Sequence, residues 1–275
     1  MSAGADIRVP ARDPGPRIVV GSGWWSSDRE FKQEFPGRKE LGDAVIRSVP
    51  FFDLWLDSVA RVMAPSEIVV VDSAAPLKPG AEKRASVRWI ELPFNARHST
   101  DHLGRWSGWM RSVLVSGNYA MASDCDYFVY VEQDCLLQGS DLWKTCSEAM
   151  TADHMFGSGA GTPQPLQQSF FVIRGAALPR FLANLTRLER RDRDLSPEWK
   201  FVWACSDTLT RLANVGLFRT KITRKVGLKI AKALGLFCFL PVGSGRARPI
   251  PFDTPHYYFQ HGTGDEIARY QREVA

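Results

Sequence analysis

The sequence predicts an α/β protein with a mostly parallel, mixed β-sheet flanked by helices. The apolar run Tyr127–Val131 is rich in β-branched and aromatic residues, as expected for a strand buried on both faces. Similar short runs lie at residues 17–20 and 68–71, and segments with helical spacing separate the three. Strands that alternate with helices in this way are typical of βαβ units and a parallel sheet.

Length and composition favour one large folded domain. The chain has 275 residues, of which 44% are hydrophobic and 24% charged, enough for a single sizeable core. Residues 1–16 are a mixture of Pro, Gly, Asp and Arg, which predicts a disordered or loosely attached tail. We therefore expect one domain over residues 17–275.

Cysteine usage and the absence of long apolar runs suggest a cytoplasmic protein. The five cysteines show no CxxC and no paired spacing, so neither a disulfide framework nor a structural zinc site is predicted. The first residues have no apolar signal-like segment, and no apolar run is long enough to span a bilayer. A net charge of +5 favours an anionic partner.

Two glycines interrupt the first predicted strand. In RIVVGSGWWSS, Gly21 and Gly23 suggest a strand end that turns tightly and lets a ligand approach the backbone, so Gly21 and Ser22 are candidate binding residues. No third glycine completes GxGxxG, and GxxxxGK[ST] is missing from the sequence. A dinucleotide fingerprint and a P-loop are therefore not supported.

The next segments continue the alternation. Ser48 and Pro50 are typical of the start of a helix, whose apolar stripe ends before Pro65. A second strand ends in Asp72, and a third, at residues 86–92, leads into a polar loop. That loop carries Asn95 and Arg105, and a helix with an apolar stripe follows from Trp106.

Two carboxylates follow the central strand. Glu132 and Asp134 come directly after Tyr127–Val131, and open α/β sheets bind ligands at the carboxyl ends of their strands. Two such carboxylates can share a hard divalent cation, which can in turn hold a diphosphate. The alternative is an acidic pair that faces solvent or caps the next turn.

These motifs carry a resemblance to a known family. The order IVVVDSAAP, LPFNARHS and GWMRSVLVSGNYAMASDCDYFVYVEQDC resembles the nucleotide-sugar-binding half of GT-A fold glycosyltransferases, especially the family-2-like group, over residues 17–138. The resemblance implies that Asp72 contacts the nucleoside. It also implies that Glu132, Gln133 and Asp134 occupy the three positions of the D-x-D motif, with Glu replacing the first Asp. Asn95 and Arg105 match the polar loop of the donor site.

Residues 139–275 would then contribute the acceptor side of the cleft and a tail that closes over the metal. The charged run LERRDRDLSPEW is interpreted as a solvated connection. The following helix, FVWACSDTLTRLANVG, resembles the base-bearing helix of inverting family members, with Asp207 as the general base. An ordinary first-turn Asp is the alternative, and Glu198 is the next candidate base.

A second group of candidate site residues lies near the C-terminus, in GSGRARPIPFDTPHYYFQHGTGD. Arg246 and Arg248 form a basic loop suited to a diphosphate. By resemblance to metal-dependent GT-A enzymes, His261 completes the metal site with Glu132 and Asp134, and His256 is its competitor. Two carboxylates, an imidazole and phosphate oxygens suit Mn²⁺, and Mg²⁺ is the alternative.

A basic amphipathic stretch, residues 221–237, is compatible with two arrangements. It can lie at an anionic membrane, at the inner face, or dock on the protein with its basic face in water.

The resulting hypothesis is a metal-dependent, inverting glycosyltransferase. It would use a nucleotide-sugar donor and a glycan or lipid-linked acceptor, and no nucleic acid. The alternatives are a retaining enzyme, a sugar nucleotidyltransferase, and a non-catalytic basic module that binds a glycan or nucleic acid.

Overall fold

The computed structural model of the chain describes residues 15–29 and 40–274. Nearly all of the tail predicted at residues 1–16 lies outside the described residues. All five cysteines are free, as the sequence predicts.

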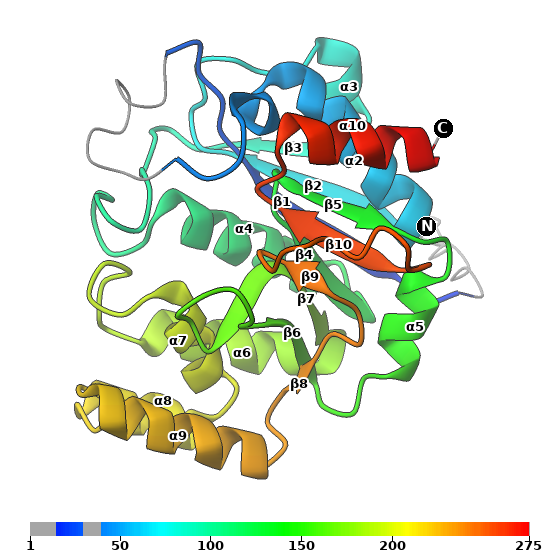
Figure 1. Cartoon of the computed structure of the whole chain (residues 1–275). Helices are drawn as coiled ribbons and strands as arrows, with labels where there is room; N and C mark the ends of the chain where they lie inside the picture. The colour runs from blue at the N-terminus through cyan, green and yellow to red at the C-terminus, as the bar shows by residue number, and fades with distance from the viewer. Residues whose placement is uncertain (1–14, 30–39, 275) are drawn as a thin grey trace, which may run out of the picture.

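A seven-stranded sheet forms the centre of the molecule (Figure 1), in the order β3-β2-β1-β4-β7-β6-β8. Its strands are β1 (Ile18–Trp24), β2 (Glu67–Asp72), β3 (Arg88–Glu91), β4 (Tyr127–Val131), β6 (His154–Ser158), β7 (Leu166–Arg174) and β8 (Cys238–Phe239). The first four in spatial order are parallel, β7 is antiparallel to both β4 and β6, and β8 is parallel to β6. The predicted α/β class with a mostly parallel, mixed sheet is confirmed.

Helices cover both faces of this sheet. They are α2 (Val49–Met63), α3 (Ala81–Ala85), α4 (Gly108–Ala122), α5 (Leu142–Glu148), α6 (Leu178–Arg187), α7 (Pro197–Ala204), α8 (Asp207–Asn214), α9 (Lys221–Ala233) and α10 (Gly264–Val274), with short 3₁₀ helices η1 (Ala44–Arg47) and η2 (Gly175–Ala177). As predicted, α2 starts after Ser48 with Pro50 in its first turn, and ends at Ala64, whose φ of 41° breaks the helix. The helix predicted across residues 201–216 is instead two helices, α7 and α8.

The glycines of β1 serve packing and do not form the tight turn that the sequence suggested. The strand continues through both of them to Trp24. A Cβ at Gly23 would lie 2.8 Å from the Ser112 hydroxyl of α4, and one at Gly21 would overlap Ser116. Ser22 is buried within the same strand. Helix α4 is therefore the group that approaches this backbone, and the ligand contact of Gly21 and Ser22 stays a prediction.

A small second sheet lies over one face of the large one, in the order β5-β10-β9, with β5 (Cys135–Gln138), β10 (Tyr257–Gln260) and β9 (Ser244–Gly245). Strand β10 runs antiparallel to β5. Strand β5 directly follows residues 132–134, the acidic turn, which contains Glu132 and Asp134. Three aromatic side chains of β10 are at most 1% exposed: Tyr257, Tyr258 and Phe259. The C-terminal segment, expected to be a mobile tail, thus contains an internal strand of the core.

The charged connection before α7 is partly buried, contrary to the prediction of a solvated segment. Asp192 and Lys200 have no exposed side-chain surface, and the Asp192 Oδ1 to Lys200 Nζ distance is 2.6 Å. The other Asp192 oxygen accepts a hydrogen bond of 2.7 Å from the backbone N–H of Ser107, which caps α4. The two charges neutralise each other, which allows them to enter the interior.

We expect Lys200→Met to lower the free energy of unfolding by about 3–5 kcal/mol, because it leaves the Asp192 carboxylate buried without its counter-charge. Urea denaturation measures the change. Lys144→Met, at an exposed position of α5, is the control and should stay within about 0.5 kcal/mol of wild type. The double variant Asp192→Asn/Lys200→Met should recover much of the loss. A Lys200→Met protein as stable as wild type would contradict this role.

Candidate functional site

The acidic turn lies at the carboxyl ends of the parallel strands, where open α/β sheets bind ligands. Its backbone is fixed on both sides: the Glu132 N–H donates to the Ser169 carbonyl (2.8 Å), and the Cys135 N–H donates to the Glu132 carbonyl (3.0 Å). The turn faces the end of β10 in the small sheet, because β5 leads directly from the turn and Cys135 pairs with Gln260.

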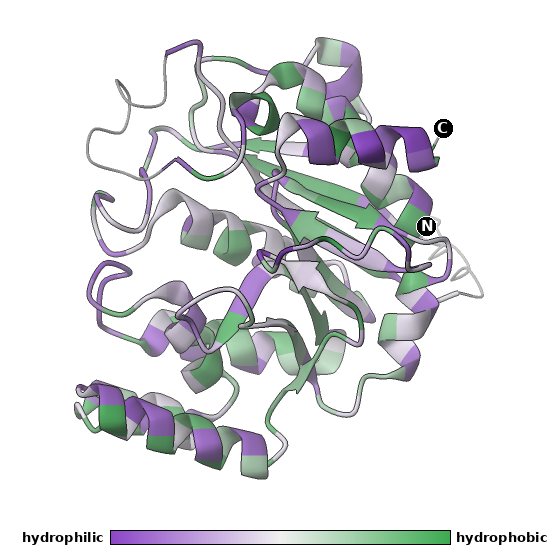
Figure 2. Cartoon of the chain, viewed as in Figure 1, coloured by the Kyte–Doolittle hydropathy of each residue, from purple (hydrophilic) through white to green (hydrophobic). Residues whose placement is uncertain are grey.

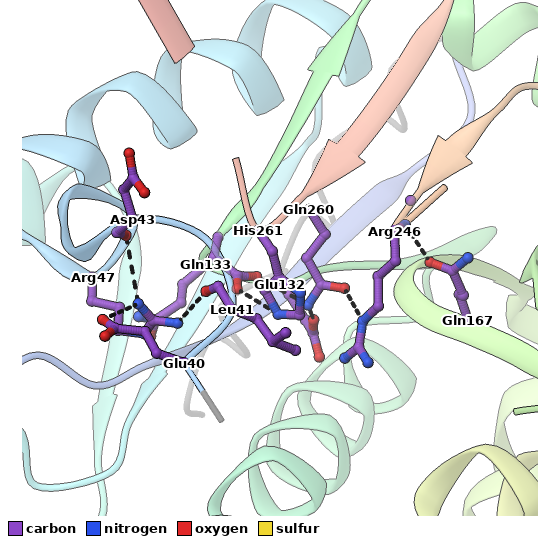
Figure 3. Close-up of polar contacts among 12 residues, drawn as sticks. Glu40, Leu41, Asp43, Arg47, Glu132, Gln133, Gln167, Arg246, Gln260 and His261 are labelled. Carbon is purple, nitrogen blue, oxygen red and sulfur yellow. Dashed lines mark hydrogen bonds and ion pairs between the residues drawn. The ribbon is translucent and has the colours of Figure 1, made fainter. Parts of the chain in front are cut away.

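Gln260 connects the acidic turn to a basic residue (Figure 3). Its side-chain nitrogen donates to Glu132 Oε2 and lies 3.2 Å from Asp134 Oδ1. Its side-chain oxygen accepts from Arg246 Nε at 3.3 Å. Gln260 is only 4% exposed, so its amide is held in this orientation. Sequence reasoning missed this residue, and the only local signal was its position next to His261.

His261 joins the same cluster. Its Nε2 lies 3.2 Å from Asp134 Oδ2. Burial lowers the pKa of His261 to about 4, with help from Arg246, Arg47 and Arg248 and against the opposing effect of Asp134. The imidazole is therefore neutral at pH 7, the state in which histidine binds metals. The competitor His256 lies beside Gly139, at the opposite end of the β5–β10 pair.

The donor atoms of this cluster suit a divalent cation, although the side chains are not arranged around one. Two carboxylates and a neutral imidazole match the preferences of Mn²⁺. Within residues 15–29 and 40–274, no group of three or more His, Cys, Asp or Glu side chains could hold a metal ion as it stands. The Gln260 amide nitrogen contacts both carboxylates, so a cation between them would require this amide to rotate away.

Of the two arginines predicted to face a diphosphate, only Arg246 reaches the cluster. Its backbone N–H also donates to Gln167 Oε1 (2.8 Å), which holds the loop against β7. Arg248 instead forms an ion pair with Glu266 of α10 (2.6 Å) and donates to the Gln260 carbonyl (2.9 Å). Its guanidinium joins α10 to the end of β10, and its phosphate role stays a prediction.

Gln133 has a structural role in the acidic turn, and its predicted ligand contact stays a prediction. Its side-chain oxygen accepts from the Trp25 N–H (2.6 Å), and its nitrogen donates to the Trp25 carbonyl (2.9 Å). This pair of bonds joins the acidic turn to the chain just after β1. Trp25 also lines a cavity of about 290 Å³, together with Ser26, Arg47, Pro50 and Leu77 among others.

Asp72 is fully buried at the end of β2. It has no exposed surface, its Oδ1 accepts from the Ala75 N–H (2.8 Å), and its Oδ2 lies 3.3 Å from Lys78 Nζ. The resemblance placed Asp72 at this strand end, where the carboxylate holds the loop that follows β2. Its contact with a nucleoside stays a prediction.

The polar loop after β3 is also held by its own side chains. Asn95 Oδ1 accepts from the Arg97 N–H at 2.8 Å, which fixes a local turn. The Arg105 guanidinium donates to the carbonyls of Thr186 (2.7 Å) and Leu188 (2.6 Å) at the end of α6. Both side chains thus make hydrogen bonds within the fold, and their contacts with the donor stay predictions.

Asp207 lies apart from the acidic turn. It begins α8, which Figure 1 shows at the lower left, away from β10. Its carboxylate is 2.7 Å from the Arg180 guanidinium, which holds the pKa of Asp207 down at about 2. This carboxylate lies in the first turn of α8 and pairs on the surface, as the alternative interpretation has it. The general-base role of Asp207 stays a prediction.

Glu198, the second candidate base, lies in the first turn of α7 and interacts electrostatically with Arg246. Burial raises the pKa of Glu198, and the Ser196 hydroxyl and the Arg246 charge oppose this shift. Ser196 in turn donates to Gln164 Oε1 (3.1 Å), on the loop between β6 and β7. A partly buried carboxyl with a raised pKa beside a cationic group is suited to proton transfer.

The sheet order, with the acidic turn at the end of β4, is a mixed, mostly parallel α/β fold of the kind that the sequence resemblance implied. No protein-family model matches the sequence, and no curated protein matches it.

Several solved structures are similar to the chain. TarS 1-349 of S. aureus, in complex with UDP, is 13% identical with a TM-score of 0.41, over 68% of this chain and 54% of that one. The mannosyltransferase PcManGT of Pyrobaculum calidifontis, with GDP-Man and Mn²⁺, is 14% identical with a TM-score of 0.39, over 80% and 70%. A cytidylyltransferase of Leptospira borgpetersenii is 14% identical with a TM-score of 0.40, over 82% and 75%. The chain thus spans about half the length of the TarS fragment, and no residue role depends on these similarities.

We expect Asp207→Asn to lower the melting temperature in a pH-dependent way. The folded-state pKa of about 2 lies below the ordinary value of 3.8, so the ionised carboxylate stabilises the fold above about pH 4. This contribution is lost as the pH falls through 2. The difference from wild type should be constant from pH 7 to about 4 and then vanish, and Arg180→Gln should behave alike. A difference that persists at pH 2 would show that charge pairing is not the cause.

Proposed function

We propose that the chain is a glycosyltransferase that moves a sugar from a nucleotide-sugar donor to an acceptor hydroxyl. The observation that carries the proposal is the cluster at the carboxyl end of β4. In it one amide connects two carboxylates to a guanidinium, and a neutral imidazole lies against one of the carboxylates. Such a set can hold the diphosphate of a donor together with a cation. Negative charge develops on this leaving group during transfer.

The donor would extend from the cavity beside Trp25 to the acidic turn, which the Gln133 bonds hold next to each other. The nucleoside would occupy the cavity, and Arg246 would donate to the diphosphate. A Mn²⁺ or Mg²⁺ ion held by Glu132, Asp134 and His261 would neutralise the phosphate oxygens. Gln260 would then release the carboxylates and keep its contact with the Arg246 loop.

Glu198 is the proposed general base. The side chain lies near Arg246 and beside the loop that carries Gln164, so an acceptor bound there would face the donor end of the cluster. Its carboxylate would accept the proton of the acceptor hydroxyl as the bond to the anomeric carbon forms. Attack from the face opposite the diphosphate inverts the anomeric centre, and inversion is part of the proposal.

Asp134→Asn should weaken metal-dependent donor binding by at least about tenfold while the fold is retained, because one of the two carboxylates is lost. A thermal-shift panel of nucleoside diphosphates and their sugars, with and without Mn²⁺, measures this effect. The control is Asp57→Asn, at an exposed position of α2. The metal site would be refuted by an unchanged Mn²⁺-dependent shift in Asp134→Asn.

Glu198→Gln should leave donor binding near normal and lower sugar transfer by about 10²–10⁴-fold, the usual contribution of general-base catalysis. In wild type, transfer should rise with pH through the raised pKa of Glu198, since the base must be ionised. Asp207→Asn is the matched control and should keep wild-type turnover. The assignment fails if Glu198→Gln turns over normally.

The same assays separate the alternatives. A nucleotidyltransferase would release pyrophosphate from a nucleoside triphosphate and a sugar phosphate, and it would not transfer sugar. A non-catalytic module would bind a polyanion with a steep dependence on salt and give no turnover. Either result would overturn the proposal.

A further inference from the structure

Helix α9 carries an exposed apolar stripe. Six of the eleven exposed large hydrophobic side chains in the described parts of the chain lie between residues 215 and 234. Four of them recur at every fourth position of α9 and its C-cap: Ile222 (75% exposed), Val226 (52%), Ile230 (44%) and Leu234 (66%). Residues four apart share one face of a helix, so these side chains form one continuous strip on the surface.

The orientation of α9 is fixed by its opposite face. Gly227 and Ala231 are its buried residues. A Cβ at Gly227 would lie 2.6 Å from the ring of Phe218 and 2.8 Å from that of Trp203. The helix therefore docks through its small residues, and its large apolar side chains face outward. The two arrangements considered for residues 221–237 differ at this point. A helix docked with its basic face in water would bury Val226, Ile230 and Leu234, and the structure leaves all three exposed.

Lysines run beside the apolar strip. Lys221, Lys225, Lys229 and Lys232 are all exposed, and the sequence contains no Asp or Glu from residue 208 to residue 252. Within residues 15–29 and 40–274, none of these lysines forms an ion pair. Figure 2 shows hydrophilic and hydrophobic bands alternating along α9, which lies at one edge of the molecule. This combination of an apolar strip and unneutralised lysines is typical of helices that lie in a membrane interface.

We propose that α9 binds the surface of an anionic lipid bilayer, with Ile222, Val226, Ile230 and Leu234 inserted among the lipids and the lysines at the headgroups. In the described parts of the chain no helix is long and apolar enough to cross a bilayer, so the contact is a surface one. A second copy of the chain is disfavoured because two such faces would bring lysines against lysines. Nucleic acid is disfavoured as the partner of α9, because its phosphates would contact the lysines and leave the apolar strip uncovered.

Flotation with vesicles tests the proposal on the full-length chain. Wild type should bind vesicles that contain phosphatidylglycerol, bind pure phosphatidylcholine much more weakly, and dissociate as salt is raised. Lys225→Gln/Lys229→Gln should lower the partition coefficient about 30-fold. Each lysine near an anionic surface raises that coefficient about fivefold to tenfold. Ile222→Gln/Leu234→Gln should lower it by about tenfold or more.

Matched controls carry the same substitutions elsewhere on the surface. Lys144→Gln/Arg272→Gln removes two exposed charges, and Leu103→Gln/Met121→Gln removes two exposed apolar side chains; both should bind like wild type. Circular dichroism confirms that the α9 variants keep their fold. The proposal is overturned by equal binding to neutral vesicles, by no binding, by binding that the α9 variants retain, or by a dimer that they dissociate. Donor binding should be unchanged in the α9 variants, so this test is independent of the proposed activity.

Discussion

Two carboxylates held at one strand end repel each other, and much of the C-terminal structure serves to keep them together. Glu132 and Asp134 both contact the amide of Gln260, and His261 lies against Asp134. Gln260 is in place because β10 pairs with β5, and β10 is anchored by buried aromatic side chains. Arg248 and Glu266 secure the end of that strand. The site thus depends on a strand pairing more than on its own loop.

Local patterns predicted the parts of the molecule that local physics determines. The uninterrupted run in β4, the helical spacing of α2 and the capping residue Ser48 gave correct elements, because burial and backbone geometry act over a few residues. The sequence also predicted that His261 lies with the acidic turn, because chemically distinctive side chains follow recognisable strands there. The short strand β6 was not predicted, because its glycine-containing sequence has no clear period.

Long-range partners are what the sequence did not predict. The sequence does not show which groups Arg105, Arg248 and Asp207 contact, and in the structure each contacts a carbonyl, a carboxylate or a guanidinium that is distant in the chain. The buried pair of Asp192 and Lys200 has the same origin, because burial of either charge depends on the other. A charged residue has many candidate partners, and the fold decides among them. Sequence patterns therefore locate reactive residue types more reliably than they assign their roles.

The order of strands along the chain has a consequence for biosynthesis. The acidic turn is made before its partner, because Gln260 lies 126 residues beyond Asp134. The nascent chain therefore carries an acidic pair without its amide donor, and an unpaired β5, until residue 260 has left the ribosome. Contacts between such distant residues form late in folding. Loss of residues 257–275 would remove β10 and leave the acidic turn without Gln260 and His261. The acidic turn thus reaches its folded arrangement only after β10 has been synthesised.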